Sequence, residues 1–314
     1  MYMYLYMKNT YQNTILNDVS FNGIGLHTGK MSNVRLLPAN ENTGIIFKRT
    51  DLKSDNIIKA NFNNVSSSKL CTTLKNSAGT TISTIEHLMA AFYITGVDNV
   101  IVEIDNIELP IMDGSSKEFI KIINQIGLIK QSAKRKFLKI KKKIELKENN
   151  KIISIEPNDE SLEVEFQLNY SNSLIGNQKN QVDFYNHDLK DIYSSRTFCL
   201  YEDIETIKKQ GLAKGGSLEN AIVVKDKEIM NEGGLRNDKE FVNHKILDLA
   251  GDFLLSGYRI LGKVKCKEGG HNLSNNFLKK IFNDQSNFED FTVNNVELFK
   301  KDIKAPVNKL AVNA

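Results

Sequence analysis

Cysteine and tryptophan are scarce in this sequence, and long apolar runs are missing. The three cysteines, Cys71, Cys199 and Cys266, are far apart and form no Cys-x-x-Cys pair, which argues against a zinc site built from thiolates. An odd number of separated thiols is typical of small buried groups in a reducing cytoplasm, so we expect a cytoplasmic protein. No apolar run approaches the roughly 18 residues of a membrane span. The absence of tryptophan indicates no function.

The length and the charge set further bounds. A chain of 314 residues suits two domains of roughly 100–200 residues each. The net charge of +4 is too small to indicate nucleic-acid binding by itself. The lysine-rich segment 134–147 is either a nucleic-acid patch or a strand with one solvated face, and we favour the strand because no aromatic platform accompanies it. The apolar start, MYMYLYM, lacks the features of a signal peptide and is interpreted as an irregular start or a first strand.

The order of the expected elements indicates an α+β protein with two similar halves. Strands occupy 19–49 and about 151–170, and each half ends in two helices. Helices are expected at 83–95, 117–127, 200–211, 239–257 and 273–283, with further strands at 99–104, 221–224 and 260–266. A polar stretch at 130–136 marks the boundary, which gives an N-terminal domain over 1–130 and a C-terminal domain over 136–314.

The segment 241–252, FVNHKILDLAGD, carries the most informative pattern. His244, Asp248 and Asp252 follow one another at intervals of four residues, and such side chains lie on one face of a helix. The apolar residues of the segment form a separate stripe. An imidazole and a carboxylate one turn apart suit a divalent metal, as in helical zinc motifs. The alternative is the solvated polar face of an amphipathic helix, and the segment alone leaves both interpretations open.

A second candidate is the pair Glu86–His87 near the start of an expected helix. Ser83 and Glu86 have capping-box spacing, in which the glutamate only caps the helix, and the local sequence slightly favours this role. The alternative is a general base beside a metal, as in zinc hydrolases where a glutamate neighbours a histidine ligand.

The remaining histidines differ in their surroundings. His271 lies in EGGHNL, where glycines allow a ligand to approach closely, although a surface turn is the simpler local interpretation. His27 belongs to a glycine-rich turn, GIGLHTGK, that has neither P-loop nor dinucleotide spacing, and His187 is expected at the surface. Taken together, the His-carboxylate helix, the Glu-His pair and His271 supply three ligands, a base and an acid, the inventory of a mononuclear zinc hydrolase.

These motifs together resemble the UDP-3-O-acyl-N-acetylglucosamine deacetylases of lipid A biosynthesis. The matching strings occur in order over nearly the whole chain: GIGLHTGK (23–30), LCTTL (70–74), STIEHLMAA (83–91), GVDNVIVEIDNIELPIMDGSS (96–116), SRTF (195–198), GLAKGGSLENAIVV (211–224), LRNDKEFVNHKILDLAGD (235–252) and GGHNLSNN (269–276). Residues 1–10 and 173–190 do not match well.

The resemblance implies a fold, a metal and a reaction. Each of two α+β domains is expected to be a layer of strands packed on two helices, with the active site between the domains. The reaction would be hydrolysis of the N-acetyl group of UDP-3-O-(3-hydroxyacyl)-N-acetylglucosamine, which releases acetate in the committed step of lipid A biosynthesis. One Zn²⁺ per chain would be bound by His87, His244 and Asp248, although Fe²⁺ also occupies sites of this composition.

The resemblance also assigns the catalytic groups. Glu86 is implied as the base that takes a proton from the attacking water, and His271 as the protonated group that donates to the leaving amine. Asp252 would orient His271 and support its charge. Thr197 would donate a hydrogen bond to the oxyanion, and Lys245 would lie near the diphosphate or the charge of the site.

Substrate contacts follow from the same resemblance, with an insert at about 197–223 forming the passage for the acyl chain. The candidates are the apolar Phe198, Leu212, Ala213, Leu218 and Ala221 together with Cys71 and Tyr170, the last by stacking on uracil. Two features depart from the family. Glu268 stands where a basic residue is usual, with Lys267 as the candidate substitute for a phosphate contact, and 169–173 replaces an aspartate-aromatic-x-His-Pro loop.

The implied partner is a UDP-linked acylated amino sugar, and we expect a monomer that binds no nucleic acid. The acyl chain implies transient contact with the inner-membrane surface. The alternative function is a metal-free binding protein of the same fold, for a nucleotide sugar or RNA, which the lysine-rich segment suggests. Every expected metal and acid-base position is occupied, which argues against it. A fused dehydratase module is not expected, because 314 residues leave no room for one.

Overall fold

The N-terminal part of the chain forms three sheets and two helices in the computed structural model, which describes residues 10–292. The largest sheet has the order β2-β3-β9-β4-β5, with β2 (Val19–Ile24), β3 (Met31–Pro38), β4 (Ile45–Arg49), β5 (Ile57–Lys59) and β9 (Val100–Ile104). The smaller sheets are β6 (Val65–Ser67), β7 (Thr73–Lys75) and β8 (Thr81–Ile82), and β1 (Tyr11–Ile15) with β10 (Leu128–Lys134). The helices are α2 (Glu86–Thr95) and α3 (Lys117–Ile126), and Phe62–Asn64 is a 3-10 turn.

The C-terminal part forms a seven-stranded sheet, a small three-stranded sheet and four helices within the described residues. The large sheet contains β11 (Lys136–Ile140), β12 (Ile144–Glu148), β13 (Lys151–Glu156), β14 (Leu162–Asn169), β15 (Asn177–Asp183), β19 (Arg259–Lys267) and β20 (Phe288–Thr292). The small sheet contains β16 (Phe198–Leu200), β17 (Ile222–Lys225) and β18 (Glu228–Ile229). The helices are α4 (Lys190–Tyr193), α5 (Tyr201–Lys209), α6 (Glu240–Leu254) and α7 (His271–Phe282), and Gln285–Asn287 is a 3-10 turn.

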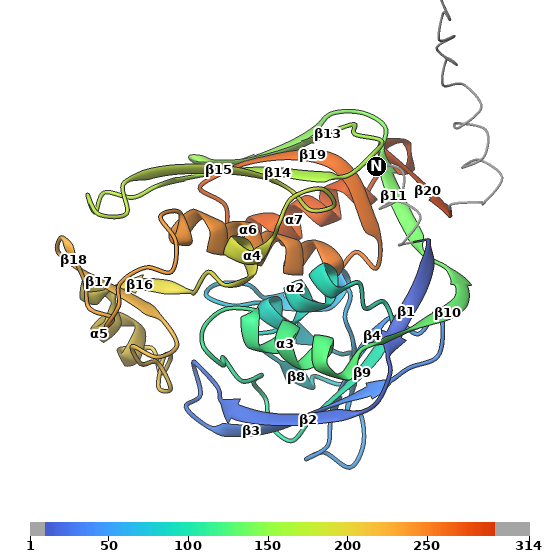
Figure 1. Cartoon of the computed structure of the whole chain (residues 1–314), viewed down its shortest axis with the longest axis horizontal. Coiled ribbons are helices and arrows are strands. Elements are labelled where there is room, and N and C mark those ends of the chain that lie inside the picture. The colour runs from blue at the N-terminus through green and yellow to red at the C-terminus, as the bar shows by residue number, and fades with distance from the viewer. Residues whose placement is uncertain (1–9, 293–314) are drawn as a thin grey trace, which may run out of the picture.

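Figure 1 shows these elements stacked in layers, with α2, α3, α6 and α7 between the two large sheets. α2 and α3 lie over the N-terminal sheet, α6 and α7 lie under the C-terminal sheet, and the two helix layers meet where α2 packs on α6. The contact is close because α6 has a glycine there: a Cβ at Gly251 would lie 2.2 Å from the Glu86 carbonyl oxygen. α5 and the β16-β17-β18 sheet project to one side.

The fold class is α+β in two domains, as expected, and each large sheet packs on helices. The chain passes from β10, paired with β1, to β11, paired with β19 and β20, across Arg135. This crossing agrees with the place of the predicted boundary, and the domain limits themselves remain a prediction.

Most expected elements are present, with shifted ends. The helix expected from residue 83 begins at Glu86, the helix expected from 273 begins at His271, and the long helix ends at Leu254 rather than 257. The lysine-rich segment forms β11, β12 and the turn between them, and its lysines pair with carboxylates, as in the contact of Lys143 in that turn with Glu156 at 2.9 Å. β6, β7 and β8 were missed, because strands this short carry little periodicity.

The expected first strand at 1–7 lies outside the described residues. Among residues 10–292, none of the helices combines the length and the apolar character needed to cross a bilayer.

Candidate active site

Helix α6 turns its polar ridge into the protein. His244, Asp248 and Asp252 are each at most 4% exposed, and Lys245 is the one residue of α6 that is not buried. The Nε2 of His244 lies 3.3 Å from Oδ1 of Asp248. The interpretation of this ridge as a solvated face is therefore wrong, because α2 and α7 pack over it.

Helix α2 brings a second histidine to the same carboxylate from the other domain. The Nε2 of His87 lies 3.6 Å from Oδ1 of Asp248, and the ring centroids of His87 and His244 are 5.0 Å apart. Glu86, one residue earlier, is also buried. The site is thus assembled from segments more than 150 residues apart in sequence, at the meeting of α2 and α6.

The capping-box interpretation of Glu86 is wrong. α2 begins at Glu86 itself, and its Ncap residue, Ile85, makes no side-chain cap. The Ser83 hydroxyl donates instead to the carbonyl oxygen of Ile107 at 3.3 Å. The Glu86 carboxylate accepts a hydrogen bond from the backbone N–H of Thr72 at 3.0 Å, which leaves its other oxygen directed toward the buried histidines.

The donor set of His87, His244 and Asp248 fits a divalent metal. Their ligand atoms all lie within 4.8 Å of one another. Donors about 2.0–2.1 Å from a tetrahedral zinc lie roughly 3.3 Å apart, close to the 3.3 and 3.6 Å that separate the imidazole nitrogens from Asp248 Oδ1. That oxygen is buried and has no hydrogen-bond partner among residues 10–292. An unpaired buried carboxylate oxygen is costly without a cation, so these residues can hold a metal.

The charge states of two of these groups suit metal binding. Burial lowers the pKa of His244 to about 3, even though Asp248 acts in the opposite direction, so its imidazole is neutral and free to ligate. Its Nδ1 lies 3.1 Å from the Ser195 carbonyl oxygen, which fixes the ring and leaves Nε2 for the metal. Burial alone would raise the pKa of Asp248, but His244, Lys245 and His271 hold it well below its usual value.

The pKa values of Glu86 and His271 are both raised, but for different reasons. Burial raises the pKa of Glu86, a tendency that His271 and His87 only partly offset. Burial alone would lower the pKa of His271, but Asp252, Glu86 and Asp248 raise it to about 10. The Nδ1 of His271 lies 2.9 Å from Oδ2 of Asp252, and its Nε2 lies 3.7 Å from Oε1 of Glu86. The charged imidazole of His271 therefore faces the Glu86 carboxyl group, an arrangement that suits an acid and a base acting on one substrate.

The sequence matches, over residues 12–283, the family described as UDP-3-O-acyl N-acetylglycosamine deacetylase. The chain belongs to this family. Three curated relatives, each named UDP-3-O-acyl-N-acetylglucosamine deacetylase, support the assignment. The protein of Pasteurella multocida is 39% identical over 95% of this chain and 99% of its own length. That of Aliivibrio fischeri is 39% identical over 90% and 93%, and that of Haemophilus influenzae is 37% identical over 95% and 99%.

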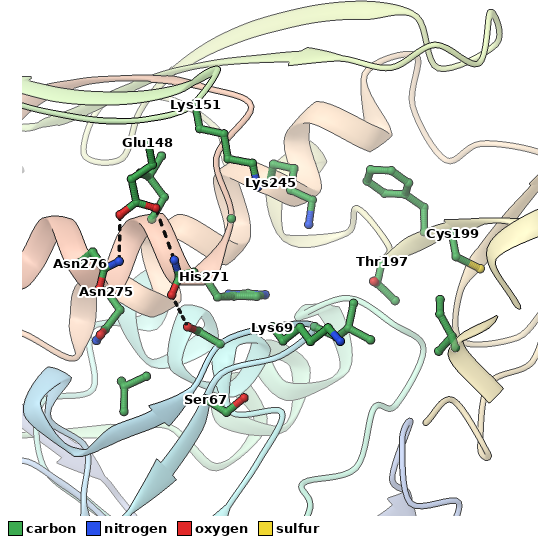
Figure 2. A pocket seen from close by; sticks show the side chains of 18 of the residues that line it. Ser67, Lys69, Glu148, Lys151, Thr197, Cys199, Lys245, His271, Asn275 and Asn276 are labelled. Atoms are coloured by element: carbon green, nitrogen blue, oxygen red, sulfur yellow. Dashed lines mark hydrogen bonds between the residues drawn. The ribbon is translucent and has the colours of Figure 1, made fainter. Parts of the chain in front are cut away.

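A cleft of about 760 Å³ opens beside the buried site of this deacetylase family member. Thr197, Phe198, Lys245 and His271 line it, and Figure 2 shows Thr197, Lys245 and His271 around its interior. Thr197, Lys245 and His271 also line the small chamber that contains the three candidate ligands, so the cleft leads to the site. The Nζ of Lys245 lies 2.9 Å from Oδ2 of Asp248 and 5.6 Å from the centroid of the Phe198 ring.

The structure brings only some of the predicted substrate residues to this cleft. Phe198 and Tyr170 line it, with ring centroids 5.6 Å apart in an edge-to-face contact. The predicted residues Cys71, Leu212, Ala213, Leu218 and Ala221 are not part of its wall. In their place the apolar wall contains Leu70, Leu200 and Ile207. Ile207 falls within the predicted insert, but the packing of α5 on β16 and β17 determines that its side chain faces the cleft.

Near Glu268, the lysine that faces the cleft comes from β13. Neither Glu268 nor Lys267 lines the cleft, and Lys267 shares the outer face of β19 with exposed Lys265. Lys151 does line it and points into it in Figure 2. Alternation along β13 places Lys151 on the same face as buried Ile153. Lys267 is therefore not the substitute at the cleft, because a one-residue step along a strand reverses the side chain's direction.

Two histidines complete the inventory. His187 is at the surface, as predicted, where its Nδ1 accepts from the backbone N–H of Asp183 at 3.1 Å. His27 is only 9% exposed and lines the chamber beside Glu86 and His87. The interpretation of His27 as an ordinary residue of a glycine-rich turn missed this, since nothing local in the sequence places that turn against α2.

Proposed function

We propose that this chain is a zinc-dependent deacetylase that hydrolyses the N-acetyl group of UDP-3-O-(3-hydroxyacyl)-N-acetylglucosamine, the deacetylation step of lipid A biosynthesis. The observation that carries the proposal is the buried Oδ1 of Asp248, which has no partner in the described chain and lies between two imidazoles. The other oxygen of Asp248, Oδ2, lies 3.9 Å from Nε2 of His271, which in turn lies 3.7 Å from Oε1 of Glu86. The names and extent of the matching relatives supply the substrate class.

His87, His244 and Asp248 would hold the metal and leave a further coordination position open. Zinc in such a site polarises a carbonyl and lowers the pKa of water to about 7. Two imidazoles and one carboxylate also suit Fe²⁺, so the metal used in the cell is part of the proposal that needs its own measurement.

The remaining chemistry is a proton transfer from the attacking water to the leaving nitrogen. Glu86 takes a proton from the water as the C–O bond forms, since its carboxylate is buried beside the ligand set. His271 gives a proton to the amine nitrogen as the C–N bond breaks, because an unprotonated amide nitrogen leaves poorly. Asp252 keeps His271 charged and fixes its Nδ1 through the 2.9 Å contact.

Thr197 and Lys245 are placed to stabilise negative charge. Both line the chamber and the cleft, and the Thr197 hydroxyl is the donor we assign to the oxyanion. The backbone N–H of Thr197 donates to the Gly114 carbonyl at 2.8 Å, which anchors this residue to the N-terminal domain. Lys245, whose Nζ forms an ion pair with Oδ2 of Asp248, would add positive charge where the diphosphate enters.

The lining of the cleft suits the two ends of the proposed substrate. Lys69, Lys151 and Lys245 line it, and Figure 2 shows Lys151 and Lys245 directed into it, where they would bind the diphosphate. Phe198 and Ile207 belong to the apolar part, where the acyl chain would lie. The ring of Tyr170 against Phe198 makes Tyr170 part of this apolar wall, and uracil stacking on Tyr170 remains the less favoured role.

The proposal includes a monomeric, cytoplasmic enzyme that touches the inner-membrane surface only through its acylated substrate. All three cysteines are free thiols, in keeping with a reducing compartment.

The test is acetate release from the proposed substrate by metal-stripped protein, with zinc added back, beside Glu86→Gln. Zinc should restore release. Glu86→Gln should keep its metal but lose about 10²–10⁴-fold in kcat, the usual contribution of a general base. The control, Glu205→Gln, removes an exposed carboxylate from α5 and should behave as the parent. Tight substrate binding by zinc-loaded protein without acetate release would instead favour a binding protein.

A further inference from the structure

Two serines contact the histidine ligands from outside the metal site, one in each domain. The Ser116 hydroxyl donates to the backbone carbonyl of His87 at 2.7 Å. The Ser195 carbonyl oxygen lies 3.1 Å from Nδ1 of His244. Both serines are fully buried, so each histidine is supported by a segment that solvent cannot reach.

The two supporting segments, 113–116 and 193–197, lie against one another across the domain interface. The backbone N–H of Ser116 donates to the carbonyl of Tyr193 at 3.1 Å, and that of Thr197 donates to the carbonyl of Gly114 at 2.8 Å. The packing at Gly114 is tight, because a Cβ there would lie 2.1 Å from the Asn220 carbonyl oxygen. Movement of one segment would therefore shift the other, and with it the support of both histidines.

Arg236 joins the two segments through a single nitrogen. Its Nη1 donates to Oδ2 of Asp113 at 2.9 Å and to the carbonyl of Ser194 at 2.9 Å, with Ser115 Oγ at 3.4 Å. Asp113 belongs to the N-terminal segment and Ser194 to the C-terminal one. Arg236 lines neither the cleft nor the chamber, so it has no direct contact with substrate to explain this position.

The backbone of Arg236 is tied in turn to α6. Its N–H donates to Oε2 of Glu240 at 2.6 Å, and Glu240 is fully buried. Oε1 of Glu240 accepts from the backbone N–H and the Nε of Arg196 at 3.0 and 2.8 Å. Glu240 stands one helical turn before His244 on the same ridge. Hydrogen bonds thus connect Arg236 to the segment that contains Ser195. They also connect it to α6, the helix that carries the candidate ligands His244 and Asp248.

We propose that Arg236 is a positioning residue for the metal site: by joining Asp113 to Ser194 it holds the Ser195 carbonyl and Thr197 in register with His87. The proposal rests on the proposed metal site and adds a residue outside it. Partners that orient a ligand commonly change metal affinity by about 10–100-fold when they are removed. The competing account is that the packing of α2 on α6 alone positions the histidines, with Arg236 contributing only to general stability.

The test uses the full chain with Arg236→Gln, and zinc alone as the probe. Zinc affinity, measured by competition with a chromogenic chelator, should fall about 10–100-fold. The melting temperature of the metal-free variant should fall no more than that of Arg49→Gln. That control breaks another Arg–Asp pair, buried Arg49 with Asp51 at 2.6 Å, whose arginine also donates to a backbone carbonyl. Arg49→Gln should keep parental zinc affinity.

Turnover gives a second readout. Because Thr197 would be displaced while the rest of the cleft wall stays in place, kcat should fall and KM should stay within about twofold. Asp113→Asn should reproduce a smaller part of the zinc effect, and the double variant should be no worse than Arg236→Gln alone, since both remove one contact. Asp113→Asn also serves as the test if Arg236→Gln does not fold.

Parental zinc affinity in either folded variant would overturn the inference, as would a loss of affinity equal to that of Arg49→Gln. Failure of the parent protein to bind zinc would instead overturn the proposed function itself, which separates the two outcomes.

Discussion

Helices α6 and α5 both border the cleft, but they are embedded to very different degrees. Every residue of α6 except Lys245 is buried, whereas α5 has no buried residue. α6 carries His244, Asp248 and Asp252, whose pKa values or contacts depend on exclusion of water. α5 contributes Ile207 and Asp203 to the outer wall of the cleft. Chemistry that needs fixed charges lies in the most buried helix, and contacts that only need an apolar surface lie on an exposed one.

Among changes that compare α6 with α5, the largest effect is expected from Asp252→Asn on α6. Asp252 is the foremost of the carboxylates that raise the pKa of His271 to about 10. His271 must be protonated to act as the acid, and its charged fraction falls as the pH rises through its pKa. Without the Asp252 charge that pKa drops, so the alkaline limb of the kcat/KM profile should move to lower pH. At pH 8 kcat should fall about 10²–10³-fold.

The matched change on α5 is Asp203→Asn, an exposed carboxylate on the wall of the same cleft. It should leave the alkaline limb in place, because Asp203 makes no contact with His271. An unshifted limb in Asp252→Asn would contradict the assigned role of His271.

A smaller loss is expected from Gly251→Ala, which tests how closely α2 is seated on α6. The added methyl would lie 2.2 Å from the Glu86 carbonyl oxygen, so α2 must move. Overpacking of this kind costs about 1–3 kcal/mol in the free energy of unfolding. Displacement of Glu86 and His87 should lower kcat about 10–100-fold. Denaturant unfolding measures the change in stability, and steady-state kinetics measures the change in kcat. A destabilised variant with parental kcat would show that the close packing of α2 on α6 does not determine the catalytic geometry.

The smallest effect is expected from Ile207→Ala on α5. The side chain is only half-buried, so the free energy of unfolding should change by about 1 kcal/mol or less. Zinc affinity should not change. KM for a long-chain substrate should rise about 3- to 10-fold through lost apolar contact, while KM for a short-chain analogue stays the same. Thr206→Ala, at an exposed neighbour on α5, is the control. Equal changes in KM for both chain lengths would place the acyl chain elsewhere.

Local patterns predicted the elements of the site better than their surroundings. The four-residue interval of His244, Asp248 and Asp252 predicted one helical ridge, and the structure contains it. Whether that ridge faced water was not decidable locally, because α2 and α7, which pack over it, come from distant parts of the chain. The same reason explains the error at Glu86. The spacing from Ser83 suits a capping box, and only the position of Thr72 shows what the carboxylate accepts.

The lining of the cleft was the least predictable part. Leu212, Ala213, Leu218 and Ala221 have suitable apolar character, but the cleft is walled by Leu200 and Ile207 instead. Apolar character in an irregular insert has no period from which a direction can be inferred. The direction of Lys151, by contrast, follows from strand alternation. Once β13 is paired with β19, alternation along β13 assigns Lys151 to the face that lines the cleft.

The sequence by itself determined the chemistry available to this protein: the identity and order of the motifs, the helical ridge of ligands, and the family to which the chain belongs. Only the tertiary structure decided the environment of those groups. Burial of α6 against α2 made His244 neutral and left Asp248 Oδ1 unpaired, and the carboxylates around His271 kept it charged. Ionisation and metal binding depend on distances and on exclusion of water, and both arise when segments far apart in sequence come together.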